Sequence, residues 1–230
     1  EGHILSPLIN TKIIFPFLTL LLTGGHTQIY FVKNIGDYKL LGETVDDAVG
    51  ESFDKVAKLL KLGYPGGPLI EEKAKNGSID LFKLPHPLEF EKSLNFSFSG
   101  IKTAVSLLIK KQDYINEKII IKIATSFQNK IIEILIKRTT LALEVLKKRG
   151  QVIKDISIVG GVAVNQKIND AYKKFCQHNN CRLIVPPQKM CGDNAAMIAW
   201  TCLQQYKKNM KPNLSFKVDP RWALSERKTL

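Results

Sequence analysis

The sequence has few of the features that mark secreted, membrane or zinc-binding proteins. Its four cysteines form no CxxC pair, so a zinc site is not expected, and reduced thiols in a cytosolic chain are the better interpretation. No uninterrupted apolar run approaches the ~18 residues that a membrane helix needs, and no signal peptide is visible. These absences favour a cytoplasmic globular protein without a membrane partner.

Acidic residues are also scarce relative to basic ones. The 230 residues include 34 Lys and Arg against 21 Asp and Glu, a formal net charge of +13. Hydrophobic residues make up 44%, which excludes wholesale disorder, and the length suits one domain or one and a half. The charge predicts either a polyanionic partner or lysines that merely cover solvated faces, and by itself it does not choose between them.

Three glycine doublets are the most informative local feature. Gly24-Gly25 and Gly160-Gly161 each close a short apolar run that is typical of a buried strand, and Gly66-Gly67 lies in a Pro-rich turn. Without a Cβ, such backbone can bring its N–H groups close to a phosphate. The doublets therefore predict loops that converge on one nucleotide-like ligand, with plain turns as the alternative.

The apolar periodicity predicts an α/β chain. The expected strands cover residues 17–22, 27–32, 38–41, 155–159 and 182–185, the first three as an antiparallel meander. The expected helices cover residues 45–60, 101–111, 117–149 and 193–207, with Thr44 and Ser99 as caps of the first two and Gly150 after the third. Another helix is expected between the strands at 155–159 and 182–185. The order of meander, helices and then strand–helix–strand is typical of an actin-like nucleotide-binding lobe.

The first of these helices carries three carboxylates in one stripe. Asp47, Glu51 and Asp54 stand at i, i+4 and i+7, with Gly50 beside them leaving room. The stripe is either an edge that faces a ligand or an ordinary wet helix face, and the pattern leaves both open.

Seven ordered motifs resemble one known family. They are Thr23-Gly24-Gly25-His26-Thr27-Gln28, Gly42-Glu43-Thr44-Val45-Asp46-Asp47-Ala48, Phe53-Asp54-Lys55-Val56-Ala57-Lys58, Tyr64-Pro65-Gly66-Gly67-Pro68, Phe96-Ser97-Phe98-Ser99-Gly100-Ile101-Lys102-Thr103, Gly160-Gly161-Val162-Ala163-Val164-Asn165 and Cys191-Gly192-Asp193-Asn194-Ala195-Ala196-Met197-Ile198-Ala199. The closing Pro220-Arg221-Trp222 also fits. On these residues the chain is similar, end to end, to the TsaD (Gcp/YgjD) family, the tRNA adenosine threonylcarbamoyltransferases, in its bacterial and organellar branch.

The resemblance implies a fold and its division. The fold is that of actin-like ATPases (ASKHA, ribonuclease H-like), with a mixed sheet in a complete C-terminal lobe and a remnant of the N-terminal lobe. Residues 1–16 would be that remnant, residues 17–192 the second lobe with a helical insertion at about 63–115, and residues 193–230 a helix and tail that return to the first lobe.

The resemblance also implies an acyltransferase. Threonylcarbamoyl-adenylate would donate its threonylcarbamoyl group to N6 of the adenosine next to the anticodon of ANN-decoding tRNAs, with release of AMP. TsaB-like and TsaE-like proteins would be partners. For tRNA phosphates the basic residues near the C-terminus are candidates: Lys207, Lys208, Lys211, Lys217, Arg221, Arg227 and Lys228.

The resemblance implies site residues at the positions of this sequence that match the family's motifs. The adenylate would be bound by Leu21, Leu22, Thr23, Gly24, Gly25, Asp54, Gly67 and Asn165. One divalent metal, iron in this family, would be held by His3 and Asp193 and would polarise an oxygen of the transferred group as a Lewis acid. Within the family an HxxxH pair supplies two histidines, of which His3 matches the second.

The first histidine of that pair and the early part of the first lobe have no counterpart in this sequence. The expectation is therefore a fragment of the transferase or a degraded copy. A non-catalytic TsaB-like partner subunit is the alternative that stays open. A metallopeptidase is disfavoured because no HExxH occurs, and phosphoryl transfer of the glycerol-kinase type would require a phosphate loop that is missing here.

Overall fold

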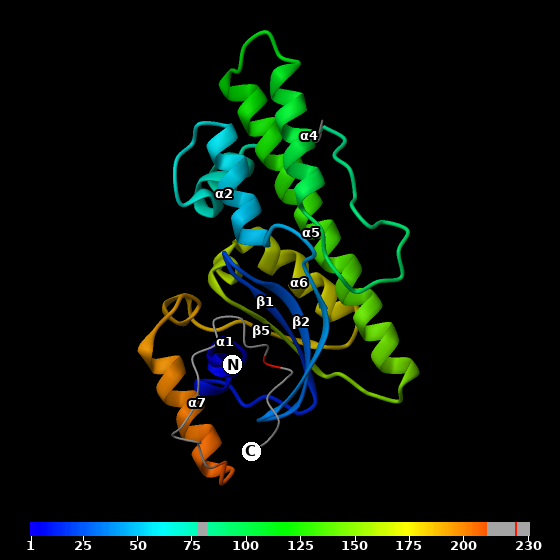
Figure 1. Ribbon diagram of the computed structural model, residues 1–230, viewed down its shortest axis with the longest axis vertical. Coiled ribbons are helices and arrows are strands. Elements are labelled where there is room, and N and C mark those ends of the chain that lie inside the picture. The colour runs from blue at the N-terminus through cyan, green and yellow to red at the C-terminus, as the bar shows by residue number, and fades with distance from the viewer. Residues whose placement is uncertain (78–81, 211–223, 225–230) are drawn as a thin grey trace.

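A mixed five-stranded sheet forms the centre of the computed structural model, which describes residues 1–77, 82–210 and Leu224 (Figure 1). The strands are β1 (Phe17–Leu22), β2 (Thr27–Asn34), β3 (Asp37–Glu43), β4 (Asp155–Val159) and β5 (Arg182–Ile184). The α-helices are α1 (Gly2–Leu5), α2 (Val49–Leu59), α3 (Gly66–Lys75), α4 (Ser99–Lys110), α5 (Glu117–Lys148), α6 (Gln166–His178) and α7 (Ala195–Lys207). Short 3-10 helices are η1 (Ser6–Ile9), η2 (Gly161–Val164) and η3 (Gln188–Met190).

The strand order is β3-β2-β1-β4-β5. β1, β2 and β3 pair antiparallel because tight turns join them, whereas β4 and β5 run parallel to β1 and to each other. Helix α6 makes the crossover between β4 and β5. The predicted meander and the predicted strand–helix–strand unit are both confirmed.

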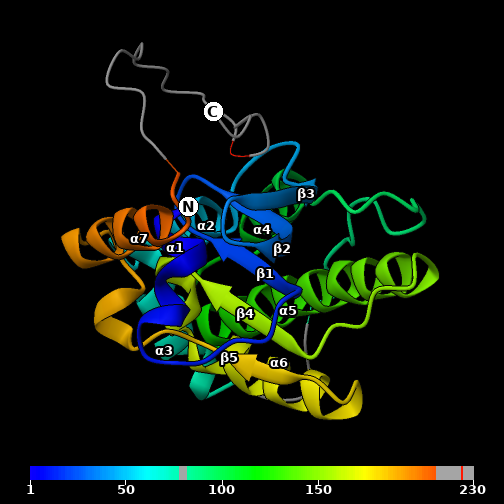
Figure 2. The same ribbon diagram turned by 90° about the horizontal axis from the view of Figure 1, so that it is seen from below.

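Both faces of the sheet are buried, and β1 shows how the sequence achieves this. Leu18, Leu20 and Leu22 point to the larger core, which also holds apolar residues of α2, α4, α5 and α6. Phe17 points to the smaller core, which includes residues of α1 and β2 and packs against Trp200 of α7. Figures 1 and 2 show α1 and α7 side by side at one side of the sheet. The nearly continuous apolar run of β1 is what a strand buried on both faces requires.

The helix that was predicted from residue 45 begins four residues later, at Val49, with Ala48 as its N-cap. Thr44 does not cap it. Instead, an isolated β-bridge pairs Thr44 with Phe96 and keeps the preceding segment extended, while the Thr44 hydroxyl donates to the Asp47 carbonyl. Asp47 therefore lies outside the helix, and the three-carboxylate helical stripe is wrong at that position.

Helix α3 was not predicted, because its start reads as a Pro- and Gly-rich turn. Pro65 is the N-cap and Pro68 lies in the first turn, where a proline removes no intrahelical hydrogen bond. Ser99 is the first residue of α4 and not its cap; its hydroxyl donates to Asp46. The other expected helices are confirmed to within two residues, and Gly150 follows α5 with a φ of +72°.

Several expectations concern residues outside the described part of the chain. Of the basic C-terminal candidates, Lys207 and Lys208 are described and exposed. The remaining ones, Lys211, Lys217, Arg221, Arg227 and Lys228, lie outside the described residues, as does Pro220-Arg221-Trp222. Among the helices in residues 1–77 and 82–210, none is long and apolar enough to cross a membrane.

Candidate functional site

The first and third glycine doublets meet at the carboxyl ends of the parallel strands β1 and β4. Gly160 has a φ of +96°, and a Cβ there would stand 2.4 Å from the Leu22 carbonyl oxygen and 2.7 Å from Thr23 Cγ2. Only glycine permits both the left-handed backbone and the close approach. This edge of an open α/β sheet is where ligands commonly bind.

The start of α2 closes on the same loop. A Cβ on Gly50 would lie 2.7 Å from the Thr23 carbonyl oxygen, to which the Gly50 N–H donates at 3.2 Å. The Thr27 hydroxyl accepts from the Val49 N–H at 2.7 Å and holds the helix end in place. The β1–β2 loop is thus pressed between the beginning of α2 and the Gly160 backbone.

The remaining doublet, Gly66-Gly67, contacts α2 at Asp54. The Asp54 carboxylate accepts a 2.7 Å hydrogen bond from the Gly66 N–H, and a Cβ on Gly66 would stand 2.6 Å from the Asp54 Cα. Asp54 is four residues after Gly50, about 6 Å along the helix. All three doublets therefore gather around one helix, whereas their convergence on one nucleotide-like ligand stays a prediction.

Other glycines of the same loops face open space. Gly24, Gly25, Gly67 and Gly161 have no atom within 4 Å of an added Cβ. The Thr23 hydroxyl accepts from the Gly25 N–H at 3.2 Å and from the His26 N–H at 2.8 Å, so the exposed loop is fixed by its own side chain. The result is an exposed loop in which Thr23 already occupies the Gly25 and His26 N–H groups.

The predicted site residues with larger side chains occupy different environments. Leu22 is fully buried and Leu21 half-buried, so a ligand could reach Leu22 only through its backbone. Asn165 is 5% exposed and caps α6: its carboxamide oxygen accepts from the Ile168 N–H at 2.9 Å, and its nitrogen donates to Gln128 at 3.0 Å. The Asn165 side chain therefore aligns α6 behind the Gly160-Gly161 loop.

The three carboxylates of the predicted acidic stripe have different partners: two pair with a lysine and one bonds to a backbone N–H. Lys55 pairs with Asp47 at 2.6 Å and with Glu51 at 2.9 Å. Hydrogen bonding to Lys55 lowers the pKa of Glu51, and the bonds to Asp47 and Glu51 raise the pKa of Lys55. Asp54 instead accepts from the first residue of α3, whose helix dipole favours a negative charge there. Of the three carboxylates, Asp54 alone borders the glycine group.

His3 and Asp193 lie together at the α1–α7 side. His3 Nε2 is 3.0 Å from an Asp193 carboxylate oxygen, and His3 Nδ1 is buried without a hydrogen-bond partner. The two residues are 190 positions apart in sequence, so this pairing is a product of the fold. Within the described residues no cluster of three or more His, Cys, Asp or Glu side chains could hold a metal ion. The pair fits as part of a metal site but lacks the third donor that catalytic sites usually have.

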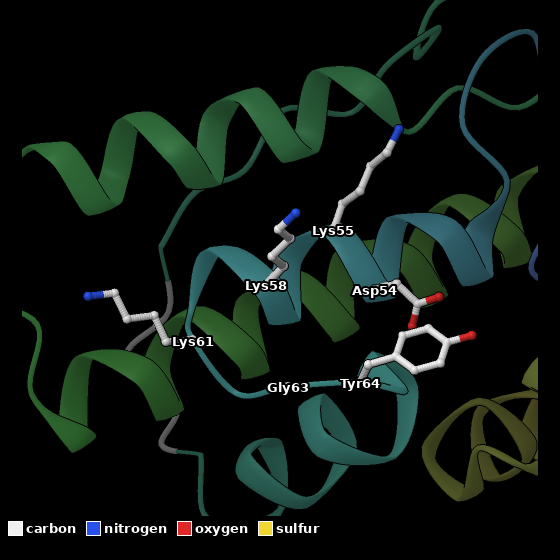
Figure 3. Close-up of a pocket in the computed structure, with 6 residues that line it drawn as sticks. All are labelled: Asp54, Lys55, Lys58, Lys61, Gly63 and Tyr64. Atoms are coloured by element: carbon white, nitrogen blue, oxygen red, sulfur yellow. The ribbon is translucent and has the colours of Figure 1, made fainter.

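A cavity of about 500 Å³ extends from Asp54 along α2. Its lining is Asp54, Lys55, Lys58, Lys61, Gly63 and Tyr64. Figure 3 shows the Tyr64 ring beside the Asp54 carboxylate, with Lys55 and Lys58 extending from the other side of the helix. Sequence reasoning singled out Asp54 only. The signal for the lysines was their place at every third position, 55, 58 and 61, along α2 and just past its end.

Comparison with known proteins agrees with the motifs. The family model described as "TsaD: tRNA N6-adenosine threonylcarbamoyltransferase" matches residues 1–200. A Pelagibacter ubique protein named tRNA N6-adenosine threonylcarbamoyltransferase is 44% identical over 225 residues, which cover 97% of this chain and 62% of that protein. A Rickettsia bellii protein of the same name is 44% identical over 230 residues, covering 98% and 67%. The chain thus spans about two thirds of the length of these relatives.

Among solved structures, the crystal structure of T. kodakarensis HypF resembles the chain with a TM-score of 0.58 at 14% identity, over 84% of this chain and 34% of that one. At this identity the likeness concerns the fold alone. With the five-stranded mixed sheet, it confirms the predicted fold class, an actin-like ATPase (ASKHA) architecture.

Proposed function

The chain belongs to the TsaD family of tRNA N6-adenosine threonylcarbamoyltransferases, and on that premise we propose that it carries the adenylate-binding lobe of such an enzyme. The reaction would move the threonylcarbamoyl group of threonylcarbamoyl-adenylate to N6 of the adenosine next to the anticodon, in tRNAs that decode ANN codons, and release AMP. The observation that supports this most directly is the convergence of the three glycine doublets around α2.

The open glycines would hold the phosphate of the adenylate. Gly24 and Gly161 leave backbone exposed at the carboxyl ends of β1 and β4, where N–H groups suit an anion, whereas the N–H of the equally exposed Gly25 would first have to leave the Thr23 hydroxyl. Asp54 has one carboxylate oxygen on the Gly66 N–H, which leaves the other to accept from a ribose hydroxyl. Backbone donors held in place by these loops would cost little reorganisation when charge develops during acyl transfer.

His3 and Asp193 would contribute two donors to a divalent metal site, with iron as the family's metal. When bound, such a metal supplies Lewis-acid polarisation of an oxygen on the transferred group. Because the described residues offer two donors, further donors would have to come from outside them. The role of this chain's own residues is to orient those two donors by packing α1 against α7.

We further propose a cytoplasmic protein that works with tRNA and with TsaB-like and TsaE-like partners. The net charge of +13 supports a polyanionic substrate. The relatives' names specify a tRNA-modifying enzyme, and this chain spans 62% of the Pelagibacter protein and 67% of the Rickettsia one.

Nucleoside mass spectrometry would test the proposal. Unmodified ANN-decoding tRNA would be incubated with iron, synthetic threonylcarbamoyl-adenylate, TsaB-like and TsaE-like proteins and one of three enzymes. These are this chain, the full Pelagibacter relative, and a chimera in which the N-terminal portion of that relative precedes Glu1.

Modified adenosine from the chimera and the relative, but not from this chain, would support a competent lobe that needs further residues for activity. Product from this chain as well would mean that His3 and Asp193 suffice. Product from the relative alone would contradict the proposal and favour a non-catalytic role of the TsaB type.

A further inference from the structure

We propose that the cavity along α2 is an RNA-binding subsite, in which Lys58 and Lys61 bind backbone phosphates and Tyr64 stacks on an unpaired base. This deepens the proposed function and rests on it for the identity of the RNA as tRNA. The cavity borders Asp54, where the adenylate would bind, so RNA held there would bring its adenosine close to the donor.

Charge balance leaves two cations of the cavity without a counter-charge. Lys55 is held by Asp47 and Glu51, and Asp54 is balanced by the Gly66 N–H at the start of α3. Lys58 and Lys61 are exposed, and in the described part of the chain neither has a carboxylate within ion-pair distance. A ligand with more than one negative charge is what this end of the cavity would accept.

The backbone at Lys61 indicates that its side chain matters. Lys61 follows the C-cap of α2 and has a φ of +57°, a conformation that glycine takes at less cost. The Leu62 N–H closes the helix end on the Ala57 carbonyl at 2.9 Å, and Gly63 follows with a φ of +111°. A lysine where glycine would be easier, beside an unpaired lysine, points to a function for the ammonium group.

Tyr64 supplies the aromatic ring of the proposed subsite. It is 83% exposed although it is a large aromatic residue, and its ring lies next to Asp54 (Figure 3). Stacking on aromatic rings is how proteins hold unpaired bases, whereas a free phosphate or a paired helix needs no ring. Two cations and an exposed ring in the lining of one cavity therefore favour single-stranded or loop RNA over a small anion.

Fluorescence anisotropy with a labelled ANN-decoding tRNA transcript, at several salt concentrations, would test this on the full 230-residue chain. Lys58→Glu/Lys61→Glu should weaken binding about tenfold and reduce the slope of log affinity against log salt by about 1.4 to 1.8, the value for two lost phosphate contacts. Lys147→Glu/Lys148→Glu changes the charge equally at two exposed lysines in the last turn of α5 and should shift affinity less than about twofold. Equal effects of the two double variants would overturn the subsite.

Three further variants separate binding from folding. Lys61→Gly should keep or raise the free energy of unfolding, because the backbone strain is relieved, and still weaken RNA binding. Tyr64→Ala should weaken binding about fivefold or more, whereas Tyr64→Phe keeps the ring and should bind like the original chain. Loss of affinity in Tyr64→Phe equal to that in Tyr64→Ala would contradict stacking. Displacement of the RNA by inorganic phosphate at equal phosphate concentration would contradict a preference for RNA over a small anion.

The RNA-binding assay tests the subsite and the nucleoside assay tests the proposed function, so either proposal can fail while the other stands. If the chimera modifies tRNA and the Lys58→Glu/Lys61→Glu substitutions change neither binding nor product, the subsite is wrong and the proposed function stands. If these substitutions weaken RNA binding but no enzyme form that contains this chain gives product, the RNA subsite stands and the transferase proposal fails. A chain that binds no RNA at any salt concentration would overturn the subsite.

Discussion

Gly160 lies against the backbone of Leu22 so closely that a Cβ on Gly160 would stand 2.4 Å from the Leu22 carbonyl oxygen. This contact fixes the Gly160-Gly161 loop on the end of β1. Gly160→Ala should lower the free energy of unfolding by about 2 to 4 kcal/mol, because it adds an overpacked methyl group to a backbone with positive φ. Urea denaturation followed by circular dichroism measures the change.

Gly161→Ala is the matched control, since a Cβ on Gly161 meets no atom within 4 Å. We expect it to change stability by less than about 1 kcal/mol. It should instead weaken binding of a non-hydrolysable adenylate analogue in titration calorimetry, because the methyl group would fill the space proposed for the phosphate. Equal destabilisation by both substitutions would contradict the close approach at Gly160.

Asp46 ties the start of α4 to the segment before α2. Its carboxylate accepts from the Phe98 and Ser99 N–H groups at 2.8 and 3.3 Å and from the hydroxyls of Ser97 and Ser99. Burial opposes ionisation, but these hydrogen bonds outweigh it and lower the pKa of Asp46. Asp46→Asn should cost about 1 kcal/mol of stability at neutral pH, after allowance for partial solvent exposure.

The pH dependence of that cost follows from the direction of the shift. A carboxylate whose pKa is lower in the folded state stabilises fully above its ordinary pKa of about 4, and this is lost as pH falls through the lowered value. The stability difference between the original chain and Asp46→Asn should therefore be constant from about pH 5 to 7 and shrink in more acidic solution. Asp113→Asn, at an exposed position between α4 and α5, should show no such difference. A pH-independent Asp46 effect would argue against an ionised acceptor.

The sequence predicted the sheet well because its signals are local. Apolar runs such as residues 17–22 and 155–159 end at glycine doublets, and the same runs become β1 and β4. Helix α3 was missed because Pro65 and Pro68 are typical of loops, and only packing of Gly66 on Asp54 shows that they begin a helix.

Side-chain partners were harder to predict. Asp47, Glu51 and Asp54 have the spacing of one helical stripe, but the β-bridge of Thr44 to Phe96 keeps Asp47 out of the helix and lets it meet Lys55. That bridge joins residues 52 positions apart, so no local pattern contains it. Likewise the approach of His3 to Asp193 could be expected only from resemblance to a family.

The His3–Asp193 pair makes a prediction about metal affinity. Two protein donors should bind Co²⁺, used as a spectroscopic probe for a divalent metal, more weakly than a site with three, by roughly tenfold or more for each missing donor. His3→Ala and Asp193→Ala should each reduce Co²⁺ binding in titration calorimetry. His178→Ala, which removes an exposed histidine at the end of α6, is the control. Binding that persists unchanged in both site variants would place the metal elsewhere.

Arg138 of α5 is fully buried, and its guanidinium donates to the carbonyls of Leu88, Glu91 and Ser93. Burial lowers the pKa of Arg138, yet the group remains charged at any ordinary pH. Arg138→Met keeps much of the buried volume but removes the guanidinium from three carbonyls, of which Leu88 still accepts from the Glu91 N–H. We expect it to lower the free energy of unfolding by about 2 to 4 kcal/mol.

Lys137→Met, one position earlier on the same helix, removes a charge that has no such buried role and should cost less than about 0.5 kcal/mol. Limited proteolysis should also show faster cleavage near residue 90 in Arg138→Met, because the arginine is what holds residues 88–93 on α5. A stable Arg138→Met variant with unchanged proteolysis would mean that packing of the segment, and not these hydrogen bonds, keeps it in place.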